Sequence, residues 1–225
     1  MNIEVVGKVI IGAGDVVDVV PALLFIVYYR GLTPPLRTLG CFFVVSLVLK
    51  IITLFMSWSK VNNMSVYHLI GLAELVFFFL YYGQAMARGR AWTRWVFVLA
   101  LLYISYTWLE VGLERFNALG WAGVSLLVLS LGLYYFYHLY RQDTVVAIDR
   151  HPGFFINAGL LIYAAGSFFT YLLGWRILSQ PAEGFFHNAW IIQVVATLVR
   201  DIAVAYGIWL HHHNLTNSRS SSPAR

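Results

Sequence analysis

Long apolar runs alternate with short polar connections along the whole chain. Each run is close to the roughly 20 residues that a membrane-crossing helix needs. No connection is long enough for a separate domain. The pattern therefore predicts an all-α fold, a single seven-transmembrane-helix bundle over residues 1–211, followed by a polar tail at 212–225 that we expect to be disordered. The seven runs lie at 9–29, 39–57, 66–86, 95–112, 121–140, 154–173 and 187–211.

Composition places these runs in a lipid bilayer. The 225 residues are 60% hydrophobic and only 11% charged, whereas a water-soluble domain of this length exposes far more charge. The net charge of +5 does not indicate a nucleic-acid partner, because the basic residues fall in short loops where they meet lipid headgroups. We expect a multi-pass protein of the cytoplasmic (inner) membrane.

The distribution of basic residues predicts the orientation of the bundle. Four of them fall on the same side of the membrane as the N-terminal end of the first run, and nine fall on the opposite side. This asymmetry places the N-terminus outside and the C-terminus in the cytoplasm. The four are Lys8, Lys60, Arg115 and Arg176; the nine are Arg30, Arg37, Arg88, Arg90, Arg94, Arg141, Arg150, Arg219 and Arg225.

Several ionisable residues interrupt the apolar runs. A carboxylate deep in a bilayer costs about 2.5–3.5 kcal/mol, so it is rarely left without a partner. At about 1.5 Å per residue, Asp15, Asp18, Lys50 and Glu74 all fall in the outer half of their runs. We expect Lys50 to pair with one of the acids and the others to remain available for a ligand, a proton or a metal.

Further polar residues reach the same outer end. His68 opens the third run, while His187, Asn188 and Gln193 open the seventh. The predicted ligand-binding set is Glu74, Asp15, Asp18, His68, His187, Asn188, Lys50 and Gln193. The alternative is that these groups only hold the helices together, as polar networks between packed helices do.

Arg200 and Asp201 lie deeper in the seventh run. As sequence neighbours they point about 100° apart on a helix, so the spacing does not predict a pair. Snorkelling of Arg200 toward an interface is the alternative, although Arg200 is rather central in its run for that.

The sixth run carries small residues at a helical spacing. Gly159 and Gly166 are seven apart, which predicts a face that packs closely against another helix. Asn157 and Ser167 are placed to form hydrogen bonds across helices.

Three stretches resemble a family of small, uncharacterised seven-helix bacterial integral membrane proteins. They are the run Pro152-Gly153-Phe154-Phe155-Ile156-Asn157 with Gly159, Tyr163, Gly166 and Phe168-Phe169, the helix that carries His68 and Glu74, and Phe186-His187-Asn188. The resemblance implies the size and topology of the chain, and it leaves the function open.

Three function classes fit a cluster of acids near the outer surface. We favour a sensory or ligand-binding receptor that signals to a partner chain through its cytoplasmic loops, because the tail is too short to hold a signalling domain. A zinc-dependent intramembrane hydrolase of the ceramidase or adiponectin-receptor type would need His68, Glu74 and His187 as metal ligands, but no paired histidines at helical spacing support it. A small proton-coupled transporter would use the buried acids as a relay.

Two cofactors fit less well. Retinal would need a Schiff-base lysine in the middle of the seventh run, where Thr197, Arg200 and Asp201 stand instead, and arginine cannot replace lysine in this role. Haem bound between His68 and His187 has no other support in the sequence.

Overall fold

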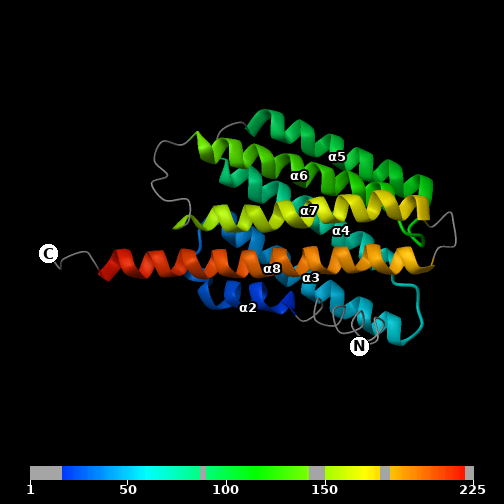
Figure 1. Ribbon diagram of the computed structural model, residues 1–225, viewed down its shortest axis with the longest axis horizontal. Helices are drawn as coiled ribbons and strands as arrows, with labels where there is room; N and C mark the ends of the chain where they lie inside the picture. The colour runs from blue at the N-terminus through cyan, green and yellow to red at the C-terminus, as the bar shows by residue number, and fades with distance from the viewer. Residues whose placement is uncertain (1–16, 87–89, 142–149, 178–182, 221–225) are drawn as a thin grey trace.

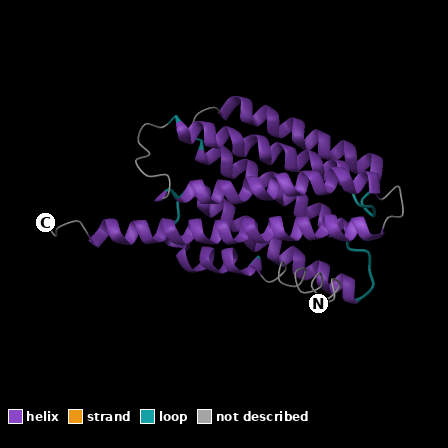
Figure 2. Ribbon diagram, in the orientation of Figure 1, coloured by secondary structure: helices purple, strands orange, loops and turns teal. Residues whose placement is uncertain are grey.

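The computed structural model describes residues 17–86, 90–141, 150–177 and 183–220. Within these ranges the chain is all helical, with seven α-helices, one short 3₁₀ turn and no strand (Figure 2). The all-α prediction is therefore confirmed, and each predicted run corresponds to one helix. The elements are α2 (Val19–Tyr28), η1 (Tyr29–Gly31), α3 (Pro34–Trp58), α4 (Met64–Ala85), α5 (Arg90–Val111), α6 (Ala118–Tyr140), α7 (Pro152–Ile177) and α8 (Glu183–Ser220).

Six of the described helices are long and apolar enough to cross a membrane, and α2 belongs to a shorter apolar stretch. Their outward faces are apolar as well: on α5, Leu99 is 64% exposed and Leu109 is 86% exposed. A surface of this kind is stable only against lipid or another apolar surface. The chain is a multi-pass membrane protein.

Six helices close into a ring in the order α2, α3, α4, α6, α7 and α8, with α8 packing back against α2. Helix α5 lies outside the ring, against α6 and α4 (Figure 1). The most extensive interface among the described helices is between α7 and α8. The ring follows the chain order with only α5 left out, as short connections between neighbouring helices favour.

The predicted small-residue face of α7 is the reason that α7 and α8 approach so closely. A Cβ atom added at Gly159 would lie 2.5 Å from the Cβ of Ala203 and 3.3 Å from the Cα of Arg200. A Cβ at Gly166 would lie 2.8 Å from the Cβ of Ala196. The prediction of close packing is confirmed, because neither position has room for a side chain.

Polar side chains also connect α4, α6 and α7 with one another inside the bundle. The buried Tyr82 hydroxyl donates a hydrogen bond of 2.7 Å to Asn157 Oδ1, and Asn157 Nδ2 donates one of 3.0 Å to the Gly132 carbonyl. The predicted cross-helix bonding of Asn157 is confirmed. That of Ser167 is wrong, because its buried hydroxyl has no partner among the described residues.

The prediction of a disordered tail from residue 212 is wrong as far as residue 220. Helix α8 continues to Ser220, and three contacts anchor the extension. The ring of His212 stacks on Tyr28 at 4.1 Å, that of His213 stacks on Trp209, and Asn214 Nδ2 donates a hydrogen bond to the Arg150 carbonyl. Polar residues thus continue the helix because aromatic and backbone partners hold them in place.

Candidate functional site

Four charged side chains from three elements meet inside the bundle. Asp18 precedes α2, and its carboxylate binds Lys50 of α3 and Arg200 of α8. Arg200 Nη2 lies 2.9 Å from Asp18 Oδ1, and Arg200 Nε lies 2.7 Å from Asp201 Oδ1. Both acids and the arginine are at least 96% buried. Since each buried charge faces an opposite one, the cluster offsets much of its desolvation cost.

Aromatic rings surround the Arg200 guanidinium on the remaining sides. Its central carbon lies 4.3 Å from the centroid of Tyr163 on α7 and 5.4 Å from that of Phe43 on α3. These distances are within the range of cation–π attraction. Arg200 does not snorkel to an interface; inside the bundle it links α3, α7 and α8 with Asp18 at the start of α2.

Glu74 of α4 lies beside this cluster but outside its ion pairs. Its carboxylate accepts a hydrogen bond of 2.8 Å from the Tyr163 hydroxyl, and its side chain is buried. Among the described residues, the ion pairs of the cluster use only Asp18 and Asp201 as acids. Among the described residues, three carboxylates therefore stand against two cations, and Glu74 takes part in none of the three ion pairs.

A cavity of about 380 Å³ opens against these groups. We call it the charged cavity. It has room for about a dozen waters or a small organic molecule. Its wall comes from α3, α4, α6, α7, α8 and the loop before α6; the lining residues are Phe42, Ser46, Leu47, Lys50, Ile51, Thr53, Leu54, Ser57, Asn63, Tyr67, Ile70, Glu74, Phe116, Trp121, Tyr163, Tyr171, Gln193, Val194, Thr197 and Arg200.

One face of α8 supplies the polar floor of the charged cavity. Gln193, Thr197 and Arg200 follow each other at helical spacings of four and three, so they share a face. Gln193 Nε2 donates a hydrogen bond to the Tyr171 hydroxyl, while its buried Oε1 has no partner among the described residues. An unsatisfied buried acceptor is costly, and a donor on a bound molecule would satisfy it.

His68 does not reach the charged cavity. Its ring lies behind Trp121, with centroids 6.5 Å apart, and edge-on to Trp108. Its Nε2 bonds to the Arg115 carbonyl. The prediction that His68 belongs to the acidic cluster is therefore wrong: the two indole rings and the carbonyl hold the imidazole one layer further out.

Four of the eight predicted site residues lie at the charged cavity or bind its walls: Asp18, Lys50, Glu74 and Gln193. The predicted pairing of Lys50 with an acid is confirmed. Asp15 and the side chains of His187 and Asn188 lie outside the described residues. Within the part of the chain that the structure describes, no three His, Cys, Asp or Glu residues come together as a metal site. Of the three zinc ligands considered from the sequence, His68 and Glu74 lie within the described residues, and the side chain of His187 does not.

The spacing argument missed Arg200, Asp201 and Tyr163. Arg200 and Asp201 do pair although they are neighbours: Arg200 Nε donates a hydrogen bond of 2.7 Å to Asp201 Oδ1. A signal was present in the sequence: Gln193, Thr197 and Arg200 mark one polar face of an otherwise apolar helix. Tyr163 carries no comparable signal, since tyrosines are numerous in this chain.

No known protein family, curated protein or solved structure matches the chain. The resemblance to small seven-helix bacterial membrane proteins therefore depends on the quoted residues alone, and the site has to be interpreted from its own chemistry.

Proposed function

We propose that this protein is a membrane receptor that binds a small organic cation in the charged cavity and passes the signal to a partner. The observation that carries the proposal is Glu74, a buried carboxylate at the cavity wall with a tyrosine hydroxyl as its hydrogen-bond donor. Because Lys50 and Arg200 are engaged by Asp18 and Asp201, a bound monocation would balance the excess negative charge.

The remaining wall suits the same ligand. Tyr67, Trp121 and Tyr171 line the same cavity as Glu74. Aromatic faces attract ammonium groups, most strongly where water is excluded. The unsatisfied Oε1 of Gln193 offers an acceptor to an N–H or O–H of the ligand. A small amine or quaternary ammonium compound combines these features, whereas an anion would meet Glu74 unfavourably.

The cavity would face the outside of the cell. The basic residues at its end of the bundle include Lys60 and Arg115, whereas those at the opposite end include Arg30, Arg37, Arg141 and Arg150. This asymmetry supports an outside N-terminus and a cytoplasmic C-terminus in the cytoplasmic membrane. Fusing a periplasmic-active reporter enzyme after Ser59 and after Arg141 tests it: we expect activity only from the first fusion.

Helix α8 supplies a route for the signal. It carries Arg200 at the cavity and continues without a break to Ser220, contacting η1 through a bond from His211 to the Gly31 carbonyl. A ligand that changes the charge balance around Arg200 would favour one arrangement of α8 over another. The partner would read that arrangement at the cytoplasmic end, as a second chain or a second copy of this one.

The test is a thermal-shift titration of the detergent-purified protein with choline, tetramethylammonium and ethanolamine. At a hundredfold excess over the dissociation constant, a ligand stabilises by about 2.7 kcal/mol, which raises the melting temperature by roughly 5 °C in a chain of this size. We expect the rise for at least one probe with the natural chain and with Glu110→Gln, whose acid is exposed on α5, but not with Glu74→Gln. No rise for any probe, or an unchanged rise with Glu74→Gln, would refute the proposal.

A small proton-coupled carrier is the second candidate. A second cavity at the other end of the bundle favours it, because a carrier needs access from both faces and Glu74 could carry a proton. Probe-dependent acidification inside proteoliposomes, lost with Glu74→Gln, would support this candidate over the receptor. In the part of the chain that the structure describes, no group of metal-ligand residues favours the zinc hydrolase.

A further inference from the structure

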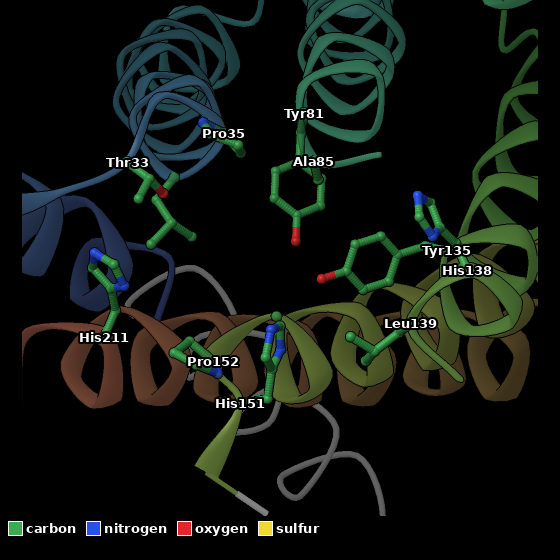
Figure 3. A pocket seen from close by; sticks show the side chains of 12 residues that line it. Thr33, Pro35, Tyr81, Ala85, Tyr135, His138, Leu139, His151, Pro152 and His211 are labelled. Carbon is green, nitrogen blue, oxygen red and sulfur yellow. The ribbon is translucent and has the colours of Figure 1, made fainter. Parts of the chain in front are cut away.

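The end of the bundle opposite the charged cavity holds a second cavity, of about 260 Å³. We call it the histidine cavity. Helices α3 and α7 both begin at it, and α4, α6 and α8 complete its wall (Figure 3). None of the described residues that line it is acidic. It is separate from the charged cavity and shares no lining residue with it.

Two tyrosine hydroxyls point into this space. Tyr81 of α4 is 2% exposed and Tyr135 of α6 is 8% exposed, and Figure 3 shows both hydroxyl oxygens directed toward the centre of the cavity. Neither hydroxyl forms a hydrogen bond with a described residue, and neither oxygen is among the fully buried atoms that lack a partner, so both reach the open space of the cavity. Polar groups inside a protein usually have a hydrogen-bond partner, which here is a water or a bound molecule in the cavity. Two hydroxyls directed into one cavity can both donate to a molecule with several acceptor atoms.

Three histidines stand around the same space. The Nε2 atoms of His138 and His211 each lie 3.3 Å from a backbone carbonyl, that of Met86 and that of Gly31. These contacts hold the two rings in place at the wall of the cavity. His151 has a buried Nδ1 without a partner in the described chain. Burial lowers the pKa of the His151 imidazole, which favours its neutral form; the Nδ1 atom donates a hydrogen bond where it carries the proton.

The backbone adds positive potential. Thr33 precedes α3 and His151 precedes α7, so both helices turn their N-terminal ends toward the cavity. The N-terminal end of a helix carries a partial positive charge that attracts anions. Hydroxyl donors, imidazoles and two helix N-termini, with no carboxylate in the lining, all favour a negative ligand.

We propose that the histidine cavity binds a phosphate group, with the Tyr81 and Tyr135 hydroxyls as its donors. A phosphate offers several strong acceptor oxygens, enough for both hydroxyls and for His151 at once. The cavity has room for the group and several waters. The phosphate belongs either to a small soluble molecule or to a lipid headgroup, because the cavity lies at an end of the membrane-spanning helices.

The test measures binding to the purified full chain in two arms. One arm titrates inorganic phosphate into protein in a neutral detergent. The other compares native mass spectra of protein with phosphatidic acid and with a neutral diacylglycerol. Each lost hydroxyl should weaken binding about tenfold, so we expect the Tyr81→Phe/Tyr135→Phe double variant to lose about 100-fold in affinity. Tyr140→Phe, which removes an exposed hydroxyl of α6, should bind as the natural chain does.

Every outcome decides the proposal. Binding in the first arm identifies a soluble phosphate, and binding in the second arm alone identifies a headgroup; both support the site if the double variant loses it. The substituted phenylalanines keep the ring packing of Tyr81 and Tyr135. An unchanged melting temperature of the double variant without ligand verifies that it is folded. If neither probe binds the natural chain, or if the double variant binds as tightly as Tyr140→Phe, the site does not exist.

Discussion

Replacing Arg200 with methionine is expected to lower the stability of the protein by about 3–5 kcal/mol, the range measured when one partner of a buried ion pair is removed. Methionine fills a similar volume but leaves Asp201 without a cation and Asp18 with Lys50 alone. In a chain of this size the loss corresponds to a fall in melting temperature on the order of 10 °C. Thermal unfolding in detergent measures it.

The effect should come from uncompensated charge rather than from lost packing. Adding Asp201→Asn to Arg200→Met removes the stranded carboxylate, so the double variant should be more stable than Arg200→Met alone. Arg115→Met, at an exposed position between α5 and α6, should change the melting temperature little. A double variant that is no more stable than the single one would show that the Asp201 carboxylate does not depend on Arg200.

The helices follow from the sequence because the bilayer leaves the backbone no alternative. A chain in lipid has to form its hydrogen bonds internally, so an apolar run of about 20 residues has to be a helix. Helix ends are less predictable. Helix α3 begins at Pro34 and α8 ends at Ser220, beyond the apolar runs at 39–57 and 187–211, because backbone hydrogen bonding continues through polar residues.

The site was partly predictable for a related reason. Position along a run becomes depth at a constant rise per residue, and this placed Asp18, Lys50 and Glu74 at neighbouring depths, as the structure does. Depth does not give direction around the ring. The His68 ring contacts Trp121 and the Arg115 carbonyl instead of the acids. The shapes of the neighbouring side chains determine this direction, and the spacing of residues along the sequence does not reveal those shapes.

The close approach of α7 and α8 positions the site as well. Gly159 faces α8 beside Arg200, where an added Cβ would lie 3.3 Å from both the Cα and the carbonyl oxygen of that residue. A side chain at this position would therefore displace backbone atoms that cannot rotate away. The small residue at 159 thus allows the arginine to reach Asp18 from α8.

Gly159→Ala is expected to destabilise the protein by about 1–3 kcal/mol through overpacking, against a gain in helix propensity of about 1 kcal/mol. Gly83→Ala is the matched control, because its Cβ would meet nothing within 4 Å; only the propensity gain remains, so its melting temperature should rise slightly. Adding Ala203→Gly to Gly159→Ala removes the closest clash, at 2.5 Å, and should restore part of the loss. Equal responses of the Gly159 and Gly83 variants would mean that α7 and α8 are not in close contact at this point.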